Sequence, residues 1–382
     1  MYKLIRLLVL SGTLLVQSAW AQLIDTPADF AVIMDFESGE ILYSKNGEDP
    51  MIPASMTKMM TAHIVFDRLE RGEIDLDDTF TVSENAWRKG GWATGGSTMG
   101  LSIGEQVTVK DLLRGVIVLS GNDACIVLAE GLSGSEEAFA TEMTELAQSM
   151  GLTSAQFKNA SGLDAPGHRI SAADLARLAQ LEIAKFPEYY SYYAEPEMTW
   201  NGITQQNRNP LLGRMDGADG LKTGHLSVSG YGLTASAVRD GERRIIVING
   251  LSSSSERAQE AERLMRLAFS AFETREIANA DARLAELDVW MGEARTVGVR
   301  MANSVSIVAH KRAFETGSTQ IVYNGPLEAP ITAGETVAKM VISLDGRDDV
   351  EVPLIATESI ERLGFLGRAI EGLSRMIEGS EA

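Results

Sequence analysis

Apolar and polar positions alternate in blocks along the first two thirds of the chain. Between Phe30 and Tyr43, two apolar runs flank the polar stretch 35–40, which predicts a β-hairpin with its turn near Gly39. From residue 56 to about residue 184, apolar residues recur at helical spacing. Two strand-like runs and an amphipathic helix follow, at residues 230–238, 244–250 and 256–272. This order of elements predicts an α/β sandwich with a helical insert.

The pattern changes near residue 277. Short β-prone segments separated by Gly, Pro and Asn turns predict a small, mostly β domain at residues 277–356, after a first domain at residues 22–276. Residues 357–382 carry apolar side chains at spacings of three and four, with charged residues between them. This predicts an amphipathic helix that is too polar to span a bilayer. Either a membrane interface or the β domain itself would cover its apolar face.

The first 21 residues have the pattern of a secretory signal. Lys3 and Arg6 precede an apolar run at residues 7–16, and the small residues Ala19 and Ala21 end the segment. A membrane anchor is the alternative, but the run is about half of the ~20 residues that a spanning helix needs. We therefore expect an exported chain that begins after residue 21 and acts in the periplasm.

Composition and charge exclude several classes of function. With 45% apolar and 23% charged residues, the 382-residue chain is globular, and its net charge of −19 argues against nucleic acid as a partner. Its one cysteine, Cys125, lies in an apolar stretch and is expected to be a buried hydrophobe without a disulfide. The sequence contains no His-Glu-x-x-His motif or paired cysteines, so no metal or other cofactor is expected.

The four histidines do not indicate a Ser-His-Asp hydrolase, because the sequence contains no Gly-x-Ser-x-Gly turn. His63 is expected to pack within the first long helix. His168 and His310 are expected at loop or strand surfaces.

Ser55 and Lys58 stand at the start of the first long helix, after Pro53. Residues three apart share one face of a helix, so the Lys58 amine could reach the Ser55 hydroxyl and act as its base. At a helix N-terminus the backbone N–H of Ser55 is also free to serve as half of an oxyanion hole. Alone, Ser-x-x-Lys is a common pattern.

Two further motifs make the pattern specific. Residues 120–122 read Ser-Gly-Asn between two predicted helices, and residues 222–224 read Lys-Thr-Gly before a strand pair. Ser-x-x-Lys, Ser-x-Asn and Lys-Thr-Gly together mark penicillin-binding proteins and class A β-lactamases. With the segments 162–167 and 207–209, residues 25–275 resemble the low-molecular-mass D-alanyl-D-alanine carboxypeptidases of peptidase family S11. The β domain and amphipathic tail are similar to the C-terminal part of the same family.

The resemblance implies a role for each matching residue. Ser55 would be the acylated nucleophile, Lys58 its base, and Ser120 with Lys222 the relay that protonates the departing D-alanine. The neutral Lys58 amine requires a lowered pKa, for which burial and the nearby Lys222 cation are the expected causes. The implied substrate-binding residues are Asn122 at the peptide amide, the His225 N–H as second oxyanion donor, and Thr223, Gly224, Arg257 and Arg208 around the terminal carboxylate.

The implied activity is removal of the terminal D-alanine from peptidoglycan stem pentapeptides, with β-lactams as inhibitors and the inner-membrane surface as a possible docking site for the tail. A DD-endopeptidase or transpeptidase, a β-lactamase and a non-catalytic wall-binding protein are the alternatives. Class A β-lactamases add a deacylating glutamate in a Glu-x-x-Leu-Asn setting. The nearest look-alike here, residues 197–201, is expected to be a strand. No role could be assigned to the Gly-rich loop at residues 87–98.

Overall fold

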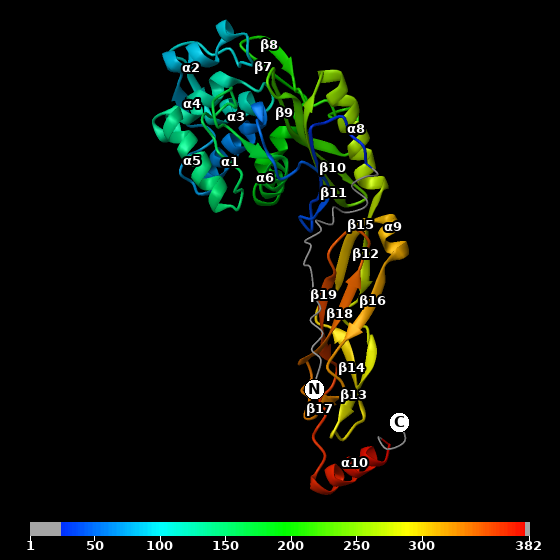
Figure 1. Ribbon diagram of the computed structural model, residues 1–382. Helices are drawn as coiled ribbons and strands as arrows, with labels where there is room; N and C mark the ends of the chain where they lie inside the picture. The colour runs from blue at the N-terminus through cyan, green and yellow to red at the C-terminus, as the bar shows by residue number, and fades with distance from the viewer. Residues whose placement is uncertain (1–23, 379–382) are drawn as a thin grey trace, which may run out of the picture. The chain divides into compact units, whose positions relative to one another are not determined.

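The computed structural model describes residues 24–378 (Figure 1). These residues fold into two compact units, and the boundary between the units falls in the sequence between Phe272 and Glu273. This is a few residues before the expected boundary at residue 277. The signal sequence expected at residues 1–21 lies outside the described residues.

A five-stranded antiparallel sheet forms the centre of the first unit, in the order β2-β1-β11-β10-β9. Its strands are β1 (Phe30–Asp35), β2 (Ile41–Lys45), β9 (Ala218–Leu226), β10 (Gly230–Arg239) and β11 (Glu242–Leu251). The predicted hairpin is confirmed as β1 and β2, with Gly39 in the turn at φ 70°. Along β11, Ile245 and Val247 enter one hydrophobic core, while Ile246 and Ile248 enter another. Both faces of the sheet are therefore buried.

Helices cover both faces of this sheet (Figure 1). On one face lies α8 (Ser254–Ser270), which starts where the Ser253 hydroxyl accepts the Glu256 N–H and which buries Leu264 and Met265. On the other face, α6 packs against β1 and β11 and the remaining helices surround it. These helices are α1 (Lys58–Glu70), α2 (Glu84–Gly90), α3 (Val109–Ile117), α4 (Asn122–Ser133), α5 (Glu136–Ser149), α6 (Ala172–Lys185) and α7 (Pro187–Tyr190). The α/β sandwich with a helical insert is confirmed.

Short strand pairs and 3-10 turns join the helices of the insert. The pairs are β3 (Pro50–Met51) with β6 (Ile170–Ser171), β4 (Thr79–Thr81) with β5 (Gln106–Thr108), and β7 (Glu197–Trp200) with β8 (Ile203–Gln206). The 3-10 turns are η2 (Ala54–Thr57), η3 (Trp92–Thr94) and η4 (Ser191–Ala194). The strand expected near residues 197–201 is β7.

The second unit is mostly β, as predicted. Its six-stranded sheet has the order β16-β18-β19-β14-β13-β17, and β12 pairs with β15. The elements are β12 (Phe272–Ala278), β13 (Ala285–Trp290), β14 (Thr296–Met301), β15 (Val305–His310), α9 (Lys311–Thr316), β16 (Ser318–Val322), β17 (Leu327–Glu328), β18 (Thr336–Ser343), β19 (Val350–Ala356) and α10 (Phe365–Glu378). Leu287, Val299, Met340 and Leu354 belong to its hydrophobic core.

The tail helix starts later than predicted. Residue 357 was its expected start, but α10 begins at Phe365. Ile360 is instead buried in the core of the β unit and exchanges two backbone hydrogen bonds with Ile331, each of 2.9 Å. A residue held in a β-bridge cannot also form a helical turn. On α10, Phe365 is 80% and Leu366 77% exposed, and no helix of the described residues is long and apolar enough to cross a bilayer.

A buried acid in α6 makes the stability of the first unit depend on pH. The Glu182 side chain is fully buried, and both carboxylate oxygens lie 3.4 Å from the Tyr193 hydroxyl. Burial raises the pKa of Glu182 well above its ordinary value, because the charged form loses its hydration. The folded chain therefore binds a proton that the unfolded chain releases above about pH 4.5.

We predict that Glu182→Gln stabilises the protein at pH 8 and has little effect at pH 4. The destabilisation by Glu182 is absent below the unfolded pKa and grows as pH rises toward the folded pKa, at about 1.4 kcal/mol for each pH unit between them. Calorimetric melting temperatures at both pH values measure this difference. Glu137→Gln, at an exposed acid, is the control. A gain of equal size at both pH values would contradict the prediction.

Candidate active site

Ser55 lies on η2, a single 3-10 turn that continues directly into α1. The sequence places it in the first turn of the α-helix, whereas the structure places it one turn earlier. In a 3-10 turn, side chains three residues apart eclipse one another. Lys58 Nζ accordingly lies 3.0 Å from Ser55 Oγ. The spacing argument thus gives the expected pairing, although the helix type differs.

The Lys58 amine is fully buried and surrounded by oxygen acceptors. Besides Ser55, it contacts Asn122 Oδ1 at 2.8 Å and the Ser161 carbonyl at 2.6 Å. Burial, with the positive charge of Arg208 as a smaller cause in the same direction, lowers the pKa of Lys58 to about 8. A neutral amine keeps two N–H donors for Asn122 and Ser161 and can point its lone pair at the Ser55 hydroxyl.

Lys222 was expected to lower the pKa of Lys58 through its positive charge. In the structure, the positive charge that lowers the pKa of Lys58 is that of Arg208. Burial lowers the pKa of Lys222 well below its ordinary value, and the charges of Lys58 and Arg208 lower it further. The buried Lys222 Nζ donates to Ser120 Oγ at 2.9 Å.

Ser120 and Asn122 stand at the junction between α3 and α4. Ser120 is buried at φ 58°, a left-handed backbone conformation that directs the chain into the new helix. Asn122 is the first residue of α4, and its backbone N–H donates to the Ser97 carbonyl at 2.9 Å. The Ser-Gly-Asn motif is therefore hydrogen-bonded to the loop at residues 91–98.

Asp123 is a structural residue of the site that the sequence analysis did not identify. Its buried carboxylate accepts the Thr98 hydroxyl at 2.7 Å and the backbone N–H groups of Met99 at 2.8 Å and Gly100 at 2.8 Å. Charge-assisted bonds of this kind are the stronger hydrogen bonds of proteins. In the sequence, the position of Asp123 directly after Ser-Gly-Asn, with a Gly-rich loop upstream, was the signal that could have identified this role. The loop at residues 87–98, for which the sequence predicted no role, contributes Gly95, Gly96 and Ser97 to the lining of the pocket that contains Ser55.

The third motif lies on β9, at the edge of the main sheet. A Cβ atom at Gly224 would lie 2.6 Å from the Pro53 carbonyl, so only glycine lets the strand pack this closely against the turn that carries Ser55. Thr223 and His225 flank this glycine and line the same pocket as Ser55. The His225 ring stacks on Tyr231 of β10, with 3.9 Å between centroids.

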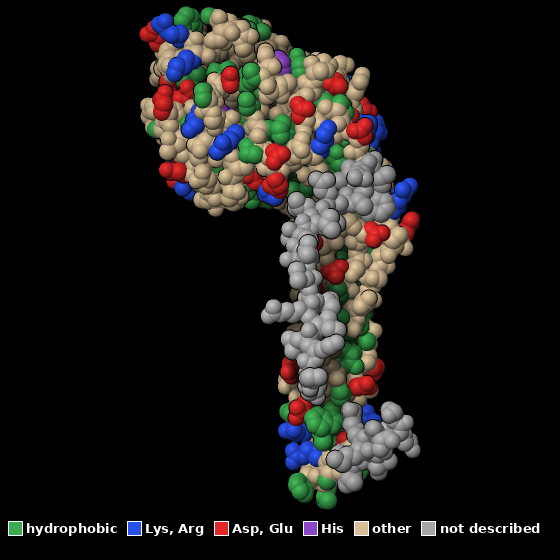
Figure 2. Space-filling view, in the orientation of Figure 1, with side chains coloured by type: hydrophobic (Ala, Val, Ile, Leu, Met, Phe, Trp, Pro, Cys, Tyr) green, Lys and Arg blue, Asp and Glu red, His purple; other side chains and the backbone are tan. Residues whose placement is uncertain are grey.

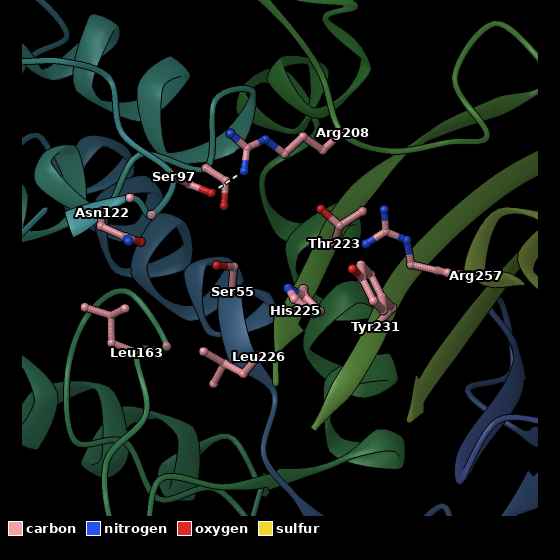
Figure 3. A pocket seen from close by; sticks show the side chains of 15 residues that line it. Ser55, Ser97, Asn122, Leu163, Arg208, Thr223, His225, Leu226, Tyr231 and Arg257 are labelled. Atoms are coloured by element: carbon pink, nitrogen blue, oxygen red, sulfur yellow. Dashed lines mark hydrogen bonds between the residues drawn. The ribbon is translucent and has the colours of Figure 1, made fainter. Parts of the chain in front are cut away.

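The three motifs meet at a cavity of about 450 Å³ (Figure 3). Figure 3 shows Ser55 near its centre, Asn122 on one side and Thr223 on the other. The remaining lining residues are Gly95, Gly96, Ser97, Ser120, Gly162, Leu163, Arg208, Gly224, His225, Leu226, Tyr231 and Arg257. The structure therefore brings every sequence-predicted site residue to this cavity or, for Lys58 and Lys222, into contact with its lining. The lining residues that were not predicted are Gly95, Gly96, Ser97, Gly162, Leu163, Leu226 and Tyr231.

Two guanidinium groups face the cavity. Arg208 donates to Ser97 Oγ, whereas the buried Arg257 lies over the Tyr231 ring at 5.7 Å and its Nε has no hydrogen-bond partner. Burial lowers the pKa of both arginines. Neither forms a salt bridge with another of the described residues. The pocket is thus prepared for an anion, although the chain as a whole is acidic.

The histidines confirm one expectation and correct another. His63 packs edge-on against Phe186 within the helical insert, as expected. His168 was expected at the surface, but it is 3% exposed and contacts Thr57 of η2, the turn that carries Ser55. The segment before β6 folds back onto η2, a tertiary contact that local sequence cannot reveal. Cys125 is buried, as expected, and burial raises its pKa to about 12, so it is not a reactive thiol.

Profiles of two known protein families match successive parts of the chain. A profile of the family described as D-alanyl-D-alanine carboxypeptidase matches residues 16–252. A profile of the penicillin-binding protein 5 C-terminal domain matches residues 272–362. The chain is 38% identical over 340 residues to D-alanyl-D-alanine carboxypeptidase DacC of Escherichia coli. The aligned region covers 88% of this chain and 85% of that protein.

Solved structures agree with the fold. The D-alanyl-D-alanine carboxypeptidase DacD from Francisella tularensis has a TM-score of 0.78 and 31% identity, covering 89% of this chain and 95% of that one. Penicillin-binding protein D2 from Listeria monocytogenes, in its ampicillin-bound form, has a TM-score of 0.57 and 29% identity, covering 65% of this chain and 99% of that one. This chain belongs to the D-alanyl-D-alanine carboxypeptidase family of serine peptidases.

Proposed function

We propose that the enzyme removes the terminal D-alanine from peptidoglycan stem peptides through an acyl-enzyme on Ser55. The observation that carries this proposal is the buried Lys58 amine, 3.0 Å from Ser55 Oγ and with a pKa lowered to about 8. A substantial fraction of this amine is neutral near pH 7 to 8 and can accept the hydroxyl proton.

In the acylation step, the Ser55 proton passes to Lys58 while Oγ attacks the carbonyl carbon of the penultimate D-alanine. The peptide C–N bond then breaks, and Ser120 passes a proton to the departing amine. Lys222, 2.9 Å from Ser120 Oγ, replaces that proton. A lysine with a lowered pKa suits this relay, because it can both give up a proton and take one back. Water then hydrolyses the ester and releases the shortened peptide.

Asn122 and the β9 strand bind the substrate backbone, and the backbone N–H groups of Ser55 and His225 stabilise the oxyanion. In this proposal Arg257 and Thr223 bind the terminal carboxylate, and Arg208, which lines the same cavity, is a further candidate. This assignment is supported by the unpaired Nε of the buried Arg257. An incoming carboxylate would supply the acceptor that this guanidinium lacks.

β-Lactams acylate the same serine in this proposal. The ampicillin-bound form of the Listeria protein supports it by similarity of fold. In the class A β-lactamase alternative, a glutamate must activate water beside the ester. Here Glu197 is an exposed residue of β7, so the penicilloyl group on Ser55 is expected to persist.

We predict that intact-protein mass spectrometry detects one penicilloyl adduct on Ser55 and none on the Ser55→Ala variant. A peptide ending in D-Ala-D-Ala is expected to lose one D-alanine. The same peptide with an amidated C-terminus is the matched control, and we expect it to react at least about tenfold more slowly because it cannot pair with Arg257. A folded protein that forms no adduct would contradict the acyl-enzyme.

The second prediction concerns pH. Only the neutral Lys58 amine accepts the Ser55 proton, so the rate constant for acylation should rise about tenfold for each pH unit up to about pH 8 and then level off. Lys58→Arg keeps the positive charge but stays protonated, and we expect its acylation to fall by about a thousandfold or more. Stopped-flow acylation by a fluorescent penicillin measures both. A flat profile from pH 6 to 9 would exclude Lys58 as the base.

We also propose that the enzyme works in the periplasm, attached to the inner-membrane surface through α10. The exposed side chains of Phe365, Leu366 and Ile370 support this, and Figure 2 shows hydrophobic side chains on the surface at the α10 end of the β unit. Apolar side chains on one face of a helix can enter the interface of a bilayer.

Phe365→Glu with Ile370→Glu is predicted to abolish co-sedimentation with anionic vesicles and to leave hydrolysis of soluble peptides unchanged. Glu371→Gln on the same helix is the control. Truncation tests should end after Gly364, since Ile360 belongs to the core of the β unit. Undiminished sedimentation of the double variant would refute attachment through this face.

A further inference from the structure

The segment at residues 158–168 lies directly against η2 (Ala54–Thr57), called here the catalytic turn because it carries Ser55. A Cβ atom at Gly162 would lie 1.9 Å from the Ala54 carbonyl oxygen and 2.8 Å from Thr57 Oγ1, so the two backbones touch. At the far end of the segment, His168 Nε2 lies 2.8 Å from the same Thr57 hydroxyl. Thr57 stands between the nucleophile and its base in the sequence, but the mechanism above gives neither Thr57 nor His168 a part.

The same segment supplies one of the acceptors that hold the catalytic base. Lys58 Nζ contacts the Ser161 carbonyl at 2.6 Å, the shortest of its three hydrogen bonds. One turn further along α1, Thr61 Oγ1 donates to the Ala160 carbonyl at 2.6 Å. The position of the base is therefore coupled to the position of this segment.

The hydrogen bonds of His168 define its protonation. The Lys158 backbone N–H donates to Nδ1 at 3.1 Å, so Nδ1 carries no proton. A neutral imidazole then has its proton on Nε2 and donates it to Thr57 Oγ1. Burial, with the positive charges of Lys158 and Lys58, lowers the pKa of His168 to about 4, which keeps the ring neutral near pH 7. Phe157 packs against the ring at 5.6 Å and 71°.

We propose that His168 is a positioning residue for acylation. By joining the Thr57 hydroxyl to the Lys158 backbone, it fixes the segment 158–168 against the catalytic turn. The Ser161 carbonyl is thereby placed where it holds the Lys58 amine facing Ser55. The inference rests on the proposed function of Lys58 as the base. His168 touches no substrate and exchanges no proton during the reaction.

Four variants separate this role from simple packing. His168→Phe keeps an aromatic ring beside Phe157 but removes both hydrogen bonds, and His168→Gln keeps an N–H donor for Thr57. Thr57→Val removes the hydroxyl with little change of shape, whereas Thr57→Ser keeps it. Acylation by a fluorescent penicillin gives three readouts for each: the fraction of active sites, the affinity of the first complex and the rate constant of the chemical step.

We expect His168→Phe and Thr57→Val each to lower the chemical rate constant by about tenfold or more, because small displacements of a catalytic group cost large factors in rate. The affinity of the first complex should stay within about twofold. Thr57→Ser should match the wild type, and His168→Gln should recover most of the rate. The double variant Thr57→Val with His168→Phe should lose no more than the single variants, since both remove one shared interaction. A purely structural role would reduce the fraction of active sites and leave the rate constant of the folded molecules unchanged.

Several results would overturn the proposal. These are a rate constant of folded His168→Phe within twofold of wild type, losses that multiply in the double variant, or a ring proton on Nδ1 in nitrogen-15 NMR spectra of the native enzyme. If His168→Phe does not fold, Thr57→Val and the NMR spectrum still decide. A wild-type enzyme that penicillin does not acylate would instead reject the proposed function, and this inference with it.

Discussion

The burial of one amine dictates most of the architecture around it. An ammonium ion moved out of water loses its hydration, and Lys58 has no carboxylate beside it among its hydrogen-bond partners, only three neutral oxygen acceptors. Those acceptors come from the catalytic turn, the start of α4 and the segment 158–168, which lie far apart in the sequence. The surroundings of Lys58, which we propose as the base, therefore form only when the helical insert is folded, and its lowered pKa is a property of the tertiary structure.

Close approach of backbones is the second requirement, and it explains two glycines. The catalytic turn lies between β9 on one side and the segment 158–168 on the other. A side chain at Gly224 would meet the Pro53 carbonyl, and one at Gly162 would meet the Ala54 carbonyl. Gly162 also has φ 79°, which other residues rarely adopt. The glycine of Lys-Thr-Gly is thus needed for close packing against the turn that carries Ser55.

The spacing of residues along the chain predicted the features that depend on short-range geometry. Periodicity gave the hairpin, the helical insert and α8, and spacing gave the pairing of Ser55 with Lys58, because short-range geometry controls both. Resemblance, and not periodicity, led to Arg208 and Arg257. The burial of His168 and the role of the Ser161 carbonyl could not be predicted, since each depends on a contact about a hundred residues away in sequence. The late start of α10 was not predicted, because an apolar residue at position 360 fits the three- and four-residue spacing of a helix as well as it fits the core of the β unit.

The site also contains conformations that the chain does not favour by itself. Ala54 has φ 48° and Ser120 φ 58°, and a left-handed backbone costs non-glycine residues of order 1–2 kcal/mol each. Asp123, three residues after Ser120, offsets the cost at the second of these positions. Its carboxylate binds four donors of the segment 98–101, and bonds to charged groups contribute about 1.5–3 kcal/mol each. Ser97, the acceptor for Arg208, immediately precedes that segment and lines the cavity, so the hydrogen bonds that stabilise the strained turn at Ser120 also hold part of the cavity wall. Stability and specificity therefore depend on the same buried acid.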